Sequence, residues 1–163
     1  MQINYKKMTI RLFACIFVFL SANLSSAESR CKVIGDNELC YVSVIHLISQ
    51  PKYYEGKFVL VSGFYRKGWG TTAIFSNREY AEFNDGANGV WVSSSRYKMN
   101  EKQVEQMNNI YSMLQSGGYS LLEKKEANNK YVKAVGIYKS GEEGHLGLYN
   151  GVIYGITKFI AHE

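Results

Sequence analysis

The sequence predicts a small β-rich domain of the α+β class, a five-stranded OB-like Greek-key barrel. Two observations predict this fold. After one short helical segment, apolar β-favouring runs occur in the order of three strands, a helix and two strands, which is the order of the OB barrel, where the helix plugs the barrel between strands three and four. Glycines lie within or beside these runs and supply bends that a small closed barrel needs. An open α+β sheet would show the same order, so the sequence leaves closure open.

The first elements follow a polar, extended lead-in at residues 28–41. Ser43 is expected to cap a short amphipathic helix, and Pro51 to end it, because the residue before a proline is pushed out of helical geometry. Residues 57–66 then form an apolar run between charged ends, which predicts a strand buried on both faces. Gly63 inside this run indicates a bend or bulge.

The remaining elements are separated by clear turn signals, among them Asn84-Asp85-Gly86 and Gly117-Gly118. Asn100 is expected to cap a helix that ends near Leu114, with apolar residues along one stripe. The further strands are predicted at residues 71–75, 90–92, 131–139 and 151–160. No internal repeat or low-complexity linker interrupts this order, so residues 28–163 are predicted to form one domain.

The first 27 residues have the three parts of a secretory signal peptide. Lys6, Lys7 and Arg11 form a cationic start, residues 12–20 are apolar, and Ser25-Ser26-Ala27 offers a cleavage site. The apolar run is too short for a bilayer span, which takes about 20 residues. We therefore predict export to the periplasm or the exterior, with no transmembrane anchor in the mature chain.

Removal of this segment changes the charge of the protein. Three of the 19 basic residues leave with it and none of the 14 acidic residues does, so the net charge falls from +5 to +2. This balance argues against nucleic acid as a partner.

Two of the three cysteines, Cys31 and Cys40, remain after removal of the signal peptide. An even number of cysteines in an exported protein predicts a disulfide. The spacing differs from the Cys-x-x-Cys motif of redox-active thiols. We expect a structural cross-link that closes a loop of about 10 residues.

Residues 42–64 (VSVIHLISQPKYYEGKFVLVSGF) contain a predicted short helix and a Gly-Lys turn before the first predicted barrel strand, and residues 131–138 and 144–153 cover later strands. Together these three segments resemble small exported bacterial OB-fold-like proteins of unassigned function. The resemblance covers most of the mature chain but concerns the fold. It implies an OB-like barrel and assigns no catalytic residue.

Cationic and aromatic residues alternate near the first predicted hairpin and again at the third strand. OB barrels bind ligands across strands two and three and the flanking loops, where aromatic rings stack and basic groups meet anions. Trp91, between two valines, is expected to lie in the core. The candidate ligand-binding residues are Tyr65, Arg66, Lys67, Trp69, Arg78, Arg96, Tyr97 and His145.

The histidines and cysteines lack the spacing of a zinc site, so neither a metal nor another cofactor is predicted. No complete catalytic constellation is recognisable. The leading hypothesis is a non-catalytic binding domain for a glycan, a peptide or a protein. One alternative is a small enzyme that uses a glutamate, such as Glu142 or Glu143, or His145. The other is a structural subunit or inhibitor of a partner protein.

Overall fold

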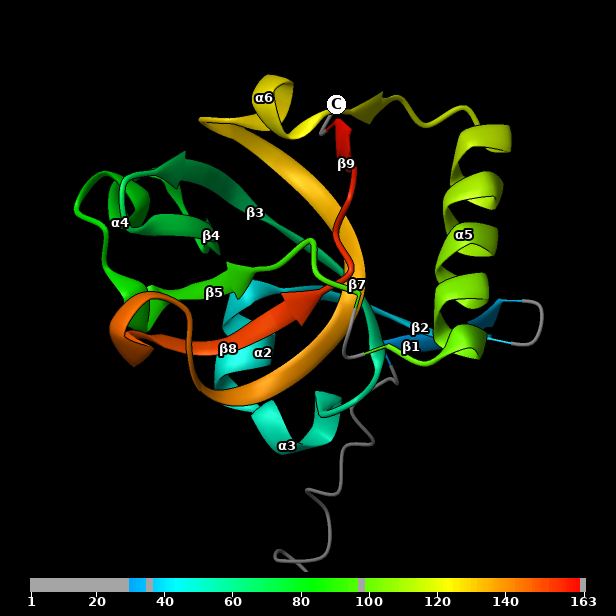
Figure 1. Ribbon diagram of the computed structural model, residues 1–163, viewed down its shortest axis with the longest axis horizontal. Coiled ribbons are helices and arrows are strands. Elements are labelled where there is room, and N and C mark those ends of the chain that lie inside the picture. Colours follow the sequence, from blue (N-terminus) through cyan, green and yellow to red (C-terminus); the bar gives the residue numbers. More distant parts are fainter. Residues whose placement is uncertain (1–29, 35–36, 97–98, 162–163) are drawn as a thin grey trace, which may run out of the picture.

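A closed five-stranded barrel forms the centre of the protein (Figure 1). The computed structural model describes residues 30–34, 37–96 and 99–161; the predicted signal peptide lies outside them. Neighbouring strands follow the order β3-β4-β5-β8-β7, and β7 pairs with β3 to close the barrel. β5 and β8 pair in parallel, and the other neighbours in the barrel pair antiparallel. The predicted β-rich, OB-like α+β barrel is confirmed. Its strands are β3 (Phe58–Gly68), β4 (Thr71–Phe75), β5 (Gly89–Val92), β7 (Lys130–Glu143) and β8 (Tyr149–Tyr154).

The long strand β3 bends at Gly63, as the sequence predicts. One edge of β3 pairs with β2 (Asn37–Ser43) over residues 58–62 and with β4 over residues 64–68, so Gly63 stands at the changeover. A Cβ atom on Gly63 would lie 2.5 Å from both Ile74 Cγ2 and the carbonyl oxygen of Phe75. Glycine is therefore required here by the close approach of β4.

The lead-in is a two-stranded ribbon of β1 (Cys31–Ile34) and β2, where the sequence indicated only an extended segment. Cys31 and Cys40 face each other in its register and form a disulfide, with an S–S distance of 2.01 Å. The predicted cross-link is confirmed. Cys40 is fully buried in the cluster of side chains that fills the barrel.

Two short helices, α2 (Val44–Ser49) and α3 (Pro51–Tyr54), supply side chains to the interior of the barrel. Ser43 is the N-cap residue of α2, as expected. Pro51 follows the end of α2, as expected, and is also the first residue of α3. Its fixed φ suits the first turn of a helix. Val44, Leu47 and Tyr54 belong to the cluster inside the barrel.

Helix α5 (Glu101–Ser116) begins after Asn100, whose side chain accepts a hydrogen bond from the Gln103 N–H at 2.8 Å. The cap is as predicted, but the expectation that this helix plugs the barrel is wrong. Its Met107, Ile110 and Tyr111 pack against Leu39, Phe58, Leu60, Val135 and Ile137, which form a cluster separate from the one inside the barrel. Figure 1 shows α5 standing beside the barrel. The interior has no room for it, since large side chains of the strands fill that space.

Two segments differ in detail from the prediction. The polar stretch between β4 and β5 contains α4 (Arg78–Glu82) and the 3-10 turn η1 (Gly86–Asn88). The predicted last strand at 151–160 is interrupted at Gly155, which has a φ of +80°, so a separate β9 follows β8. The remaining elements are β6 (Leu121–Leu122), α6 (Lys124–Ala127), η2 (His145–Gly147) and β9 (Phe159–Ala161).

Candidate functional site

The turn between β3 and β4 meets the loop between β7 and β8 at one edge of the barrel. The rings of Trp69 and His145 lie there with centroids 6.0 Å apart. A Cβ atom on Gly70 would lie 3.2 Å from His145 Cδ2, so the two segments are in contact. Trp69 is 95% exposed and Leu146, next to His145, is 80% exposed. We call Trp69, His145 and Leu146 the tip cluster.

A third segment ties these two loops together through one side chain. Asn84 Oδ1 accepts hydrogen bonds from the Thr71 hydroxyl at 2.6 Å and from the Tyr149 hydroxyl at 3.2 Å. Phe83, beside Asn84, is 84% exposed. The loops that carry the tip cluster are thus anchored to each other, and a ligand would meet a preformed surface.

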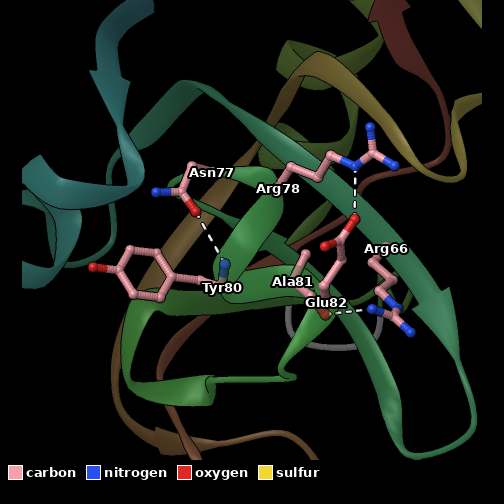
Figure 2. Close-up of polar contacts among 6 residues, drawn as sticks. All are labelled: Arg66, Asn77, Arg78, Tyr80, Ala81 and Glu82. Atoms are coloured by element: carbon pink, nitrogen blue, oxygen red, sulfur yellow. Dashed lines mark hydrogen bonds and ion pairs between the residues drawn. The ribbon is translucent and has the colours of Figure 1, made fainter.

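Two predicted basic residues, Arg66 and Arg78, share a separate cavity of about 330 Å³ with Glu82, Phe64 and Asn129. Figure 2 shows that both guanidinium groups already have partners: Arg66 donates to the carbonyl oxygen of Ala81 at 2.6 Å, and Arg78 Nε donates to Glu82 at 2.7 Å. Asn77 caps α4 by accepting the Tyr80 N–H at 3.0 Å. The Arg66 contact ties α4 to β3, and the other two stabilise α4 itself.

Tyr65 is fully buried, so it does not lie on the exposed ligand face expected for this group of residues. Strand residues alternate between the faces of a sheet, so Tyr65 points into the barrel while Phe64 and Arg66 point outward. Its side chain is fully buried, and its ring lies 4.2 Å from that of Phe159, centroid to centroid. Burial raises the pKa of Tyr65 to about 12.

The other predicted residues lie apart from the tip cluster or outside the described chain. Lys67 is exposed, and its backbone N–H donates to Asn128 Oδ1 at 2.7 Å. Arg96 is half-buried near the start of α5, and its Nε has no hydrogen-bond partner among the described residues. Tyr97 is outside the residues that the structure describes. The eight predicted residues therefore do not form one site.

Trp91 is half-buried on the outer face of the barrel, so the expectation of a core position is wrong. Its valine neighbours in β5 point inward, and Trp91 packs against Tyr149 with ring centroids 5.2 Å apart. Ala81 of α4 belongs to the same outer cluster. The face of strands two and three that an OB barrel usually offers to ligands is thus partly covered here, and the exposed aromatic surface lies at the loops.

The tip cluster contains Leu146, which the sequence prediction missed. An apolar residue between the glycines at 144 and 147 was the available signal, because a leucine in a glycine-rich turn has few neighbours to bury it. Leu146 has a φ of +58°, a region that non-glycine residues rarely adopt. This loop conformation holds the side chain outward.

The glutamates considered for catalysis, Glu142 and Glu143, are the last two residues of β7, just before the same loop. Glu143 forms an ion pair with Lys139 at 3.5 Å, and Glu142 is exposed. Among the described residues, one group of three potential metal ligands is found, Cys31, Glu38 and Cys40. Both of its sulfur atoms are held in the disulfide, so it offers no thiolate to a metal.

No protein-family model, curated protein or solved structure matches this chain. Across the described residues, no helix combines the length and the apolar character that crossing a membrane requires.

Proposed function

We propose that this chain is an exported, non-catalytic binding domain that recognises a polypeptide through the tip cluster. The observation that carries the proposal is the exposure of Trp69 beside His145 and Leu146, on the loops that flank the ligand face of OB barrels. Large apolar side chains held out in solvent are typical of interaction sites. The signal-peptide pattern and the disulfide support export, since disulfides persist in oxidising compartments.

The composition of the tip cluster favours a polypeptide over a glycan. Trp69 would stack on either ligand. Leu146 adds an aliphatic side chain, and Phe83 and Leu148 on the adjoining segments are also exposed, at 84% and 56%. A surface of aromatic and aliphatic groups complements the apolar side chains of a peptide, and tryptophan is frequent among residues that dominate binding energy.

Selection from a displayed random peptide library tests this proposal. Peptides selected on the wild-type domain should contain aromatic or aliphatic residues and should bind Trp69→Ala at least about tenfold more weakly, because the stacking surface is lost. Titrations can follow the fluorescence anisotropy of a dye-labelled peptide, a readout that also serves for Trp69→Ala. Chito-oligosaccharides, tested in parallel, should bind far more weakly than the selected peptides.

Tyr80→Ala is the matched control, since this aromatic residue is also exposed but lies on α4. It should leave peptide binding unchanged. Selected peptides that bind Trp69→Ala as tightly as wild type would remove the tip cluster from the binding site. Tighter binding of the oligosaccharides would replace the polypeptide with a glycan.

A further inference from the structure

A second cavity of about 460 Å³ lies outside the barrel, between the sheet and the end of α5. Ser43, Ser62 and Lys133 are register partners on the neighbouring strands β2, β3 and β7, and all three line it. Leu114 and Tyr119, at and after the end of α5, form the opposite wall. None of the tip-cluster residues lines this cavity, so it is a separate site. Its volume is typical of pockets for small molecules.

Among the described residues, the charged side chains that line the cavity are both basic. They are Arg30 and Lys133, and no carboxylate of the described chain lines it. Neither forms an ion pair among the residues that the structure describes. Lys133 Nζ lies 5.8 Å from the centre of the Tyr119 ring. Two cations that share a cavity without a counter-charge favour an anionic ligand.

His46 adds a polar group to the same wall. Its Nδ1 accepts the Ser43 N–H at 3.1 Å, so the neutral ring carries its proton on Nε2. This nitrogen can donate to an acceptor in the cavity, whose lining includes His46. Burial, and to a smaller extent the positive charge of Arg30, lowers the pKa of His46.

Three aliphatic side chains give the cavity an apolar part. Leu60 and Ile160 are buried, and Leu114 is partly buried; all three line the cavity. Arg30 is exposed and Lys133 half-buried, so the charge lies toward solvent and the apolar surface lies toward the sheet. A ligand that matches this arrangement has an anionic head and an aliphatic body.

We propose that this cavity binds an aliphatic carboxylate, with its head held by Arg30 and Lys133 and its chain along Leu60, Leu114 and Ile160. The planar fork of the Arg30 guanidinium suits the two oxygens of a carboxylate. The site requires no residue of the tip cluster.

Calorimetric titration with octanoate tests the proposal, with acetate and octan-1-ol as probes that keep only the head or only the chain. Octanoate should bind the mature protein, and both partial probes should bind at least about tenfold more weakly. The double variant Arg30→Gln/Lys133→Gln should bind octanoate at least about tenfold more weakly than wild type. Lys102→Gln is the control, since this exposed lysine lies at the start of α5.

NMR spectra locate the bound probe and confirm that each variant is folded. Octanoate should shift signals of His46 and Tyr119, and Trp69→Ala should bind it as wild type does, which separates this test from that of the tip cluster. The proposal is overturned if octanoate fails to bind at about 10 mM, if octan-1-ol binds equally well, or if the folded double variant binds as wild type does.

Discussion

Two tyrosine side chains, those of Tyr65 and Tyr138, lie inside the barrel. Tyr65 and Tyr138 are both fully buried, and burial raises the pKa of each to about 12, with Glu55 as a second cause for Tyr138. The Tyr138 hydroxyl donates to the carbonyl oxygens of Leu47 and Asn150 at 3.3 and 3.1 Å. The Tyr65 hydroxyl has no partner in the described part of the chain. These rings fill the space that the sequence assigned to a helix.

His46 is expected to make stability depend on pH. Burial, and then Arg30, lower its pKa below the ordinary value of 6.5. As pH falls below about 6.5, the unfolded chain takes up a proton at this residue before the folded protein does. The free energy of unfolding therefore decreases as pH is lowered, down to the lowered pKa of the folded protein. Between about pH 7.5 and about pH 5, the melting temperature of wild type should fall more than that of His46→Gln.

The control for this measurement is His145→Gln. His145 is exposed on η2, and its side chain takes no part in the cap of α2, where the Nδ1 atom of His46 accepts the Ser43 N–H. Its variant should keep the pH dependence of wild type. Equal pH dependence in His46→Gln and wild type would contradict the prediction.

At the scale of elements, the bend of β3 depends on the missing side chain of Gly63. Gly63→Ala should lower the free energy of unfolding by about 1–3 kcal/mol, because the new methyl group would collide with Ile74 and with the backbone of Phe75. Gly68→Ala is a matched control in the same strand, since nothing lies within 4 Å of a Cβ atom there. Chemical denaturation measures both, and an equal effect of the two substitutions would refute a packing role for Gly63.

The β1–β2 ribbon is held by the disulfide, and its removal should destabilise the domain. Cys31→Ser/Cys40→Ala should lose about 2–3 kcal/mol of stability on the loop-closure estimate. Alanine is chosen at residue 40 because that position is fully buried, so a hydroxyl would add a separate penalty. Thermal melts of wild type with and without reductant give the comparison. Complete thiol labelling of the native, unreduced protein would contradict the cross-link.

At the scale of the whole molecule, the signal-peptide pattern of residues 1–27 predicts the length of the mature chain. Cleavage after Ala27 should leave a mature chain that starts at or near Glu28. Mass spectrometry of protein recovered from the periplasm or the medium measures this start. A recovered chain that still carries residues 1–27 would contradict export through cleavage.

The whole molecule also places its two candidate sites apart. The tip cluster lies where the β3–β4 turn meets the β7–β8 loop. The cavity that Arg30 and Lys133 line lies outside the barrel, beside the end of α5. No residue is shared by the two, so their ligands can be tested independently.

Local patterns were enough to predict much of this protein. The strand order, the caps at Ser43 and Asn100, the glycine bend and the cysteine pair all depend on neighbours in the sequence or on counting, and the structure confirms them. Trp69, one of the candidate ligand-binding residues, is exposed.

Tertiary structure alone decided which surfaces meet. Side chains alternate between the two faces of a strand, and the register with neighbouring strands decides which set faces the core. That register places Tyr65 inside the barrel and Trp91 outside, and the sequence alone does not specify it. Closure of the barrel brought His145 to Trp69 and Lys133 to Ser43 and Ser62. Such contacts join residues far apart in the chain, so only the folded backbone determines them.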